Sequence, residues 1–177
     1  MSQTFQPWIG GASAPATKLT PLISPIDEKE VAQVADSDAA VIDAAVRNAH
    51  AAYLANREST VAQRVAWLNA AADAIETAEK AIVESLVVAI GKPRRAATLE
   101  AKRGPLFLRA TAAQLPHMLG EVLPLDAVAL GAGRFGFTTR IPYGVVGAIT
   151  AFNAPANLLS QKLAPALAMG NAVVAKP

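Results

Sequence analysis

Cysteine is absent from this 177-residue chain. The absence excludes disulfide bonds, a thiolate metal site and a cysteine nucleophile within these residues. Histidine is scarce as well, since His50 and His117 lie far apart and have no carboxylate pair at ligand spacing. Zinc sites need three or four such ligands, so we expect no metal site and interpret both histidines as surface residues.

Concentrated charge and long apolar runs are also missing. The net charge is +2, from 16 basic and 14 acidic residues that are scattered along the chain. The densest basic points, Arg94–Arg95 and Lys102–Arg103, are interpreted as a solvated helix face. Hydrophobic residues make up 53% of the chain, yet no run reaches the roughly 18 apolar residues of a membrane span. We therefore expect neither a nucleic-acid nor a membrane partner.

Three further motifs are not found. The start, Met1-Ser2-Gln3-Thr4, lacks the basic and apolar regions of a secretory signal, so a cytoplasmic protein is expected. No G-x-x-x-x-G-K-[ST] phosphate loop occurs, and Ser160 has no His–Asp context for nucleophilic catalysis. What remains is an apolar chain long enough to bury the core of one domain.

The first part of the chain contains patterns typical of two strands and then of helices. Phe5–Ile9 and Thr17–Ile23 predict a strand hairpin around Gly10-Gly11. Helix starts are indicated at Asp36–Asp38 and at Thr60, which forms a possible capping box with Gln63.

Two more helices and a hairpin are predicted next. One helix covers about Ala78–Ile90 and ends at Gly91. The other covers about Arg94–Leu115, with a kink or break expected at Gly104-Pro105 because proline removes a backbone donor. Glu121–Leu130 and Arg134–Ile141 then predict a long β-hairpin, joined by a turn with two glycines.

The last part of the chain has the pattern of a βαβ unit. Val145–Thr150 and Ala172–Ala175 read as buried strands, and between them Asn157–Met169 reads as a helix that Pro165 should kink. Such units form parallel sheets, in which ligands bind beyond the carboxyl ends of the strands. We therefore expect Thr150–Asn153 and Lys176 to lie side by side at a ligand-binding edge.

Two segments within Pro142–Pro177 carry a family resemblance. PYGVVGAITAFN ends at Asn153, and KLAPALAMGNAVVAKP begins at Lys162; together they resemble the aldehyde dehydrogenase superfamily. Upstream motifs agree in order and spacing, so the resemblance covers nearly the whole chain: Ile9-Gly10-Gly11, Ser24-Pro25, Gly91-Lys92-Pro93 and Gly120-Glu121.

The resemblance implies an α/β fold. It would be the N-terminal part of the aldehyde dehydrogenase fold, a Rossmann-like parallel sheet with helices plus a protruding β-hairpin. Residues 1–121 would begin the cofactor-binding domain, residues 122–142 would form an oligomerisation hairpin, and residues 143–177 would be the first βαβ unit. The catalytic domain would be absent, and the intact parent would be a homo-oligomer, a dimer or tetramer.

The resemblance also implies a reaction, the NAD(P)-dependent oxidation of an aldehyde to a carboxylic acid through a cysteine thioester. Asn153 matches the asparagine whose amide donates to the oxyanion, although a turn-capping asparagine is the alternative. Lys162 matches a lysine assigned to a proton relay. Burial in its apolar helix face would depress its pKa, and the alternative is an ordinary surface lysine.

Cofactor contacts are implied for five residues. Lys176 matches a lysine that binds the adenosine ribose hydroxyls, because an ammonium offers three donors; the alternative is a strand-end lysine. The adenine and ribose would lie along Ile149, Thr150, Ala151 and Phe152, for which core packing is the alternative; Ile149 is expected to do both. Ala151 departs from the family's usual proline, which makes the turn less rigid. The choice between NAD and NADP stays open.

Two classes of function follow. In the first, the chain is the N-terminal segment of an aldehyde dehydrogenase and is inactive alone, because it has no nucleophile and no base. In the second, it is a non-catalytic assembly or binding module, since an incomplete sheet leaves edges that invite pairing. Weak residual dinucleotide binding is a further possibility. The aldehyde itself stays open, although Asn157-Leu158-Leu159 would border its pocket.

Overall fold

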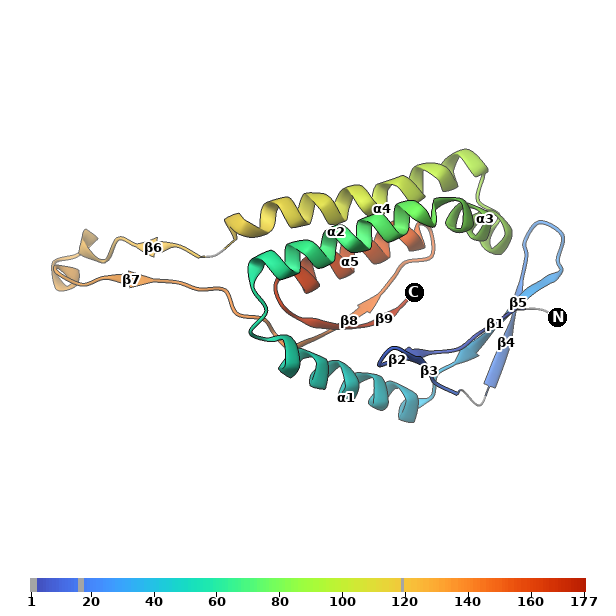
Figure 1. The fold of residues 1–177 in the computed structure, drawn as a ribbon, viewed down its shortest axis with the longest axis horizontal. Helices are drawn as coiled ribbons and strands as arrows, with labels where there is room; N and C mark the ends of the chain where they lie inside the picture. Colours follow the sequence, from blue (N-terminus) through green and yellow to red (C-terminus); the bar gives the residue numbers. More distant parts are fainter. Residues whose placement is uncertain (1–2, 16–17, 119) are drawn as a thin grey trace.

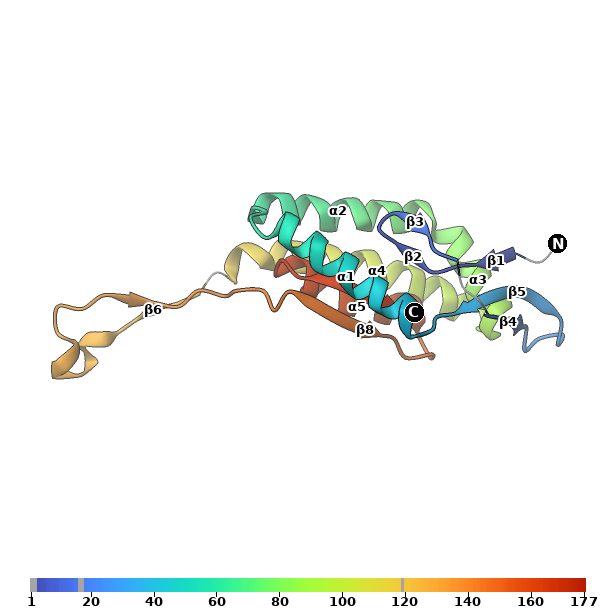
Figure 2. The ribbon, with the colours of Figure 1, turned by 90° about the horizontal axis from the view of Figure 1, so that it is seen from below.

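The computed structural model describes residues 3–15, 18–118 and 120–177. Helices and short strands form an elongated body from which a thin arm, residues 120–141, extends (Figures 1 and 2). Within the described ranges, no helix combines the length and hydropathy needed to cross a lipid bilayer.

The N-terminal strands form two small sheets. In the first, β5 (Glu30–Asp36) lies between β1 (Gln3–Phe5), which is parallel to it, and β4 (Lys18–Ile23), which is antiparallel. In the second, β2 (Trp8–Ile9) and β3 (Ala12–Ser13) form a hairpin around Gly10-Gly11.

The predicted hairpin is therefore correct in its turn and wrong in its partners. Phe5–Ile9 divides into parts of two strands, and the second predicted strand pairs with β5, which the sequence analysis missed. Thr17, its first predicted residue, lies outside the described residues. The sequence of β5, EVAQVAD, is poor in strand-favouring residues, so pairing with both neighbours forms this strand rather than its own propensity.

The first three helices begin where the sequence predicts, and the third also ends at the predicted glycine. In α1 (Ala39–Asn56), the Asp38 side chain accepts a hydrogen bond from the Val41 amide. In α2 (Val61–Thr77), Thr60 and Gln63 form the reciprocal capping box. Gly91 ends α3 (Glu79–Ile90) in the left-handed conformation, with φ of 67°.

Helix α4 (Arg94–Gln114) continues through Gly104-Pro105, so the predicted break is wrong. Both residues are buried, and α4 packs along α5 (Pro155–Ala168) at this point. A Cβ atom on Gly104 would lie 2.8 Å from the Ser160 hydroxyl of α5. Close packing against α5 thus holds the helix together where proline removes one backbone hydrogen bond. Helix α5 likewise runs through Pro165, and the short η1 (Leu115–His117) follows α4.

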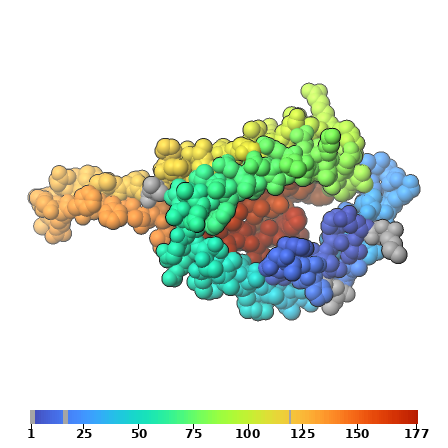
Figure 3. Space-filling view, in the orientation of Figure 1, coloured from blue at the N-terminus to red at the C-terminus, as the bar shows by residue number. Residues whose placement is uncertain are grey.

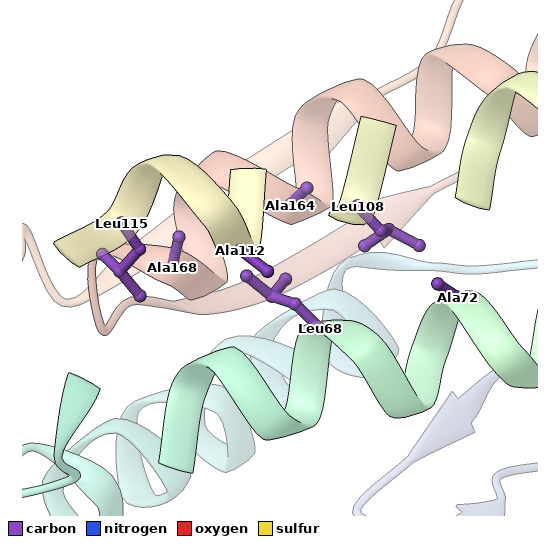
Figure 4. Packing of buried hydrophobic residues seen from close by; sticks show 7 residues of the cluster. All are labelled: Leu68, Ala72, Leu108, Ala112, Leu115, Ala164 and Ala168. Carbon is purple, nitrogen blue, oxygen red and sulfur yellow. The ribbon is translucent and has the colours of Figure 1, made fainter. Parts of the chain in front are cut away.

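The main core lies between α2, α4 and α5. Small and branched apolar side chains interdigitate there, as Figure 4 shows; the buried cluster is Leu68, Ala72, Leu108, Ala112, Leu115, Ala164 and Ala168. Alanine at the contact positions lets the helix axes approach closely. The alanine-rich composition therefore serves helix packing.

The arm confirms a protruding hairpin but corrects its strands. Only β6 (Val122–Leu123) and β7 (Gly136–Phe137) pair, and the tip consists of two 3-10 turns, η2 (Leu125–Ala127) and η3 (Ala129–Gly131). A Cβ atom on Gly131 would lie 1.6 Å from the Leu125 carbonyl oxygen. The tip is coiled onto itself through this glycine, which is why the longer predicted strands do not form.

The βαβ unit is present, but its strands are only partly buried rather than buried as predicted, because this sheet consists of two strands; Ala148 is their one buried residue. Strands β8 (Val145–Ile149) and β9 (Ala172–Lys176) are parallel, with Val145 opposite Ala172 and Ile149 opposite Lys176. Helices α1 and α5 both contact this strand pair. The molecule is thus a mixed α/β fold whose parallel pair ends at one shared edge.

Candidate functional site

The carboxyl ends of β8 and β9 meet at the predicted ligand-binding edge. The Thr150 amide donates to the Lys176 carbonyl oxygen at 3.1 Å, and the Thr150 hydroxyl lies 3.4 Å from the same oxygen. Ile149 is 70% exposed and Phe152 75% exposed, so the expected core packing of Ile149 is wrong here. Residues 149–152 and Lys176 therefore lie together at this edge, and most of them are exposed and accessible to a ligand.

A hollow leads to this part of the molecule. In the space-filling view, the C-terminal segment lies at the floor of a recess bordered by α1, α2 and the N-terminal strands (Figure 3). Lys18 and Thr20 of β4 bind Asp36 at the end of β5 and lower its pKa, and the charge of Lys176 adds a smaller effect. The N-terminal sheet thus ends close enough to Lys176 for the charges to interact.

Asn153 follows β8 and is exposed. Among the described residues its side-chain amide has no hydrogen-bond partner, so the turn-capping alternative receives no support. Its backbone carbonyl oxygen instead accepts from Lys92 Nζ at 2.8 Å. The turn is held by its backbone, and the carboxamide is free to donate.

Behind Asn153 lies a buried ion pair that the sequence analysis missed. Glu100 of α4 is 5% exposed and pairs with Lys92, which precedes α4. Its carboxylate also accepts from the amides of Ala156, at 2.9 Å, and Asn157, at 3.4 Å, in the first turn of α5. The available clue was that α5 begins with Ala154-Pro155 and has no capping or acidic side chain of its own.

The other end of α5 is also held from outside. Arg64 of α2 donates to the Ala168 carbonyl oxygen at 2.8 Å. Asn171 accepts from the Gly144 amide and donates to the Ala166 carbonyl, both at 3.0 Å. An anion at the N-terminus and a cation at the C-terminus both complement the helix dipole. The helix of the βαβ unit is therefore fixed at both ends by neighbouring elements.

Lys162 lies on α5 but does not match its predicted environment. Its side chain is exposed, and within the described ranges it makes no hydrogen bond or ion pair. The predicted burial is wrong for this structure, because no described element covers that face of the helix. The surface-lysine alternative describes its present state.

An open groove runs between α4 and α5. Its volume is about 340 Å³, and its lining is Arg103, Leu106, Phe107, Ala110, Asn157 and Gln161. Asn157 lines this groove and Leu158 and Leu159 do not, so an aldehyde pocket bordered by these three residues stays a prediction. Arg103 gives the groove one positive charge.

A parallel βαβ unit with an open edge at its strand ends defines an α/β protein of the nucleotide-binding type. Comparison with known proteins specifies it further, because the model of the aldehyde dehydrogenase family matches residues 9–177. The chain belongs to the aldehyde dehydrogenase family.

Individual relatives agree with this assignment. The chain is 36% identical, over 98% of its length, to a 2-aminomuconic 6-semialdehyde dehydrogenase from Pseudomonas sp. and covers 35% of that protein. PnpE from Pseudomonas sp. WBC-3 was solved with nicotinamide adenine dinucleotide. This chain aligns with it over its whole length, at 30% identity and a TM-score of 0.90, and covers 36% of the PnpE chain.

A third relative was solved with the other dinucleotide. An NADP-dependent glyceraldehyde-3-phosphate dehydrogenase from Bacillus halodurans C-125 was solved in complex with NADP. Its comparison with this chain gives a TM-score of 0.91 at 29% identity, and the matched region covers 96% of this chain and 36% of the dehydrogenase chain. The chain thus spans about a third of the length of these relatives.

Proposed function

We propose that this chain forms the N-terminal, cofactor-binding part of an NAD(P)-dependent aldehyde dehydrogenase that oxidises an aldehyde to a carboxylic acid. The observation that carries the proposal is the free carboxamide of Asn153 beside the strand ends that carry Thr150 and Lys176. A neutral donor just past the end of a strand, in a turn held by its backbone, suits an oxyanion that develops during the reaction. The family membership of residues 9–177 supports the same assignment.

The cofactor would lie along the edge of the parallel strands. Residues 149–152 would line the adenine and ribose, and the Lys176 ammonium would donate to the ribose hydroxyls. NAD and NADP both remain candidates, since one of the structural relatives was solved with each. A bound NAD(P) would supply the hydride acceptor for the oxidation.

The proposed organisation follows the expectations from sequence. Residues 1–121 and 143–177 would belong to the cofactor-binding domain of a cytoplasmic enzyme, and residues 122–142 would form the oligomerisation hairpin of a homo-oligomer. Lys162 would join a proton relay once another part of the enzyme covers its face of α5. Because no cysteine is present, residues 1–177 alone cannot form a cysteine thioester, and we expect them to be inactive alone.

A chimeric enzyme tests the proposal. Residues 1–177 replace the matching segment of the Pseudomonas sp. 2-aminomuconic 6-semialdehyde dehydrogenase, and reduction of NAD or NADP is followed with that semialdehyde. We expect the chimera to be active, and Asn153→Ala to lower kcat by about 10²–10³-fold. Asn56→Ala, which removes an exposed amide from α1, is the matched control and should leave kcat unchanged. A folded chimera that is inactive, or indifferent to Asn153→Ala, contradicts the proposal.

The 177-residue chain by itself provides a second test. We expect no aldehyde-dependent reduction of NAD(P), and only weak dinucleotide binding by calorimetry, because these residues span about a third of the length of their relatives. Activity of the purified chain, or sub-micromolar affinity for either dinucleotide, would contradict this expectation.

An assembly module is the second candidate, and the arm favours it. Phe135 and Leu130 are 77% and 85% exposed there, and exposed apolar side chains gathered on a thin hairpin are suited to pairing with another copy. Size-exclusion chromatography with light scattering separates the two readings. A clean monomer at all concentrations would count against assembly by this chain.

A further inference from the structure

We propose that Lys92 and Glu100 are positioning residues, which together fix the Asn153 turn so that its carboxamide faces the ligand-binding edge. The inference deepens the proposed function and rests on it for the role of Asn153. Neither residue is assigned this role by the sequence motifs, in which Gly91-Lys92-Pro93 supported only the family resemblance and Gly91 the end of a helix.

The position of the Asn153 carboxamide depends on how the backbone of its turn is held. Its side chain has no partner among the described residues, so its orientation depends on the backbone of the turn. That backbone has one long-range tether, the hydrogen bond from Lys92 Nζ to the Asn153 carbonyl oxygen at 2.8 Å. Lys92 is itself mostly buried, with 15% of its side chain exposed, and is therefore restricted in its motion.

The second tether acts on the residues that follow Asn153. Ala154 cannot cap α5 with a side chain, and Pro155 has no amide hydrogen, so the next free donors are the amides of Ala156 and Asn157. The Glu100 carboxylate accepts from both. It thus does from α4 what an N-cap residue ordinarily does from within the helix.

The ion pair between Lys92 and Glu100 connects the two tethers. As one unit, the pair holds the carbonyl of Asn153 on one side and the first turn of α5 on the other. The segment 153–157 is therefore clamped at both ends of the turn. A buried ion pair adds little stability compared with well-packed apolar residues, so stabilisation alone does not explain a pair whose remaining bonds all go to this turn.

Amide-resolved NMR of the labelled 177-residue chain tests the clamp without cofactor or activity. Lys92→Met removes the donor to the Asn153 carbonyl oxygen, and Glu100→Gln removes the charge that pairs with Lys92 and weakens the bonds to the Ala156 and Asn157 amides. We expect both variants to shift or broaden the Asn153 carboxamide resonances. Glu84→Gln is the matched control, since it breaks an exposed ion pair to Arg94 between α3 and α4. The control should leave the Asn153 resonances in place.

Lys92→Met and Glu100→Gln each leave one buried charge unpaired and could prevent folding, so charge-conserving variants provide a second test. Glu100→Asp and Lys92→Arg retain both charges and change only their reach, so they should fold and still displace the Asn153 carboxamide resonances. Unchanged Asn153 resonances in folded Glu100→Asp and Lys92→Arg would overturn the proposal, whatever the chimera shows about activity.

Kinetics of the active chimera give the second readout. Misplacing a reacting group by about 1 Å can cost about 10²-fold in rate, so Lys92→Met should lower kcat by up to about this factor. KM for the aldehyde should change little, because an oxyanion contact forms only in the transition state. Lys92→Arg should recover part of kcat. A rise in KM with kcat unchanged would show that the pair does not position Asn153.

Discussion

The helical core and the arm use apolar side chains in opposite ways. In the core, α2, α4 and α5 bury alanines completely, as at Ala72 and Ala164, and lock them with Leu68 (Figure 4). In the arm, Leu130 and Phe135 are among the most exposed side chains of the described residues. The core is therefore stabilised by contacts within the chain, whereas the arm leaves its apolar side chains exposed.

The difference separates the helical core, which is packed within the chain, from the arm, for which we propose a role in assembly. The arm is held by one two-residue ladder and by close backbone approaches at its glycines. An isolated two-stranded hairpin is marginally stable in water, so the arm should contribute little to global stability. The following predictions test this contrast.

The largest effect is expected in the core. Leu68→Ala leaves a cavity between α2, α4 and α5, and we expect a loss of about 2–5 kcal/mol in the free energy of unfolding, measured with urea. Leu99→Ala, at an exposed position of α4, is the control and should change it by no more than about 0.5 kcal/mol. Equal losses in both variants would show that the α2–α4–α5 cluster is not the stabilising core.

A smaller effect is expected at the start of α2. Thr60→Ala removes the side-chain half of the capping box, so the Gln63 amide loses its acceptor. We expect a loss of about 1 kcal/mol in the free energy of unfolding. Thr60→Ser keeps the hydroxyl and should restore most of the stability. If serine is no better than alanine, the hydrogen bond does not account for the effect.

The N-terminal sheet should show a weaker, pH-dependent effect. The hydrogen bonds from Lys18 and Thr20 hold the pKa of Asp36 below its ordinary value of 3.8. A lowered folded-state pKa means that the stabilisation is present above the ordinary value and is lost as pH falls through the folded value. A double-mutant cycle of Lys18→Met and Asp36→Asn should show coupling near neutral pH that vanishes in strong acid. Coupling that persists there would rule out the ionised carboxylate as its source.

The smallest effect on folding is expected in the arm. Phe135→Ser should change the free energy of unfolding by no more than about 0.5 kcal/mol, because the side chain is 77% exposed and its ring contacts that of Phe137, with centroids 6.0 Å apart. It should nevertheless reduce self-association measured by light scattering. Phe5→Ser, exposed but distant from the arm in the fold, is the control. An arm variant that destabilises the core as strongly as Leu68→Ala would remove the contrast.

Local sequence patterns predicted much of the fold. Asp38, the Thr60–Gln63 box and Gly91 each act within a few residues of their own helix end, so their roles can be seen in the sequence. The βαβ unit was predictable for the same reason, since the period changes from strand to helix and back. Its geometry brought Thr150 and Lys176 together as expected.

Other features depended on partners distant in the chain and were missed. Strand β5 forms between β1 and β4, and its composition alone does not favour a strand. Helix α4 continues through Pro105 because the neighbouring Gly104 lets it pack closely against Ser160 of α5. The Lys92–Glu100 pair could not be predicted either, since a carboxylate on one helix caps another helix more than fifty residues away.

The sequence by itself determined the family, through its motifs, and the parallel βαβ unit with Asn153 and Lys176 at its edge. Strand direction and loop length determine that placement locally. Only the tertiary structure decided how that edge is held. Helix α5 lacks charged caps of its own, and Glu100 from α4 and Arg64 from α2 supply them at its two ends. Backbone donors and acceptors at a buried helix end require partners, and here the chain provides them only after it has folded.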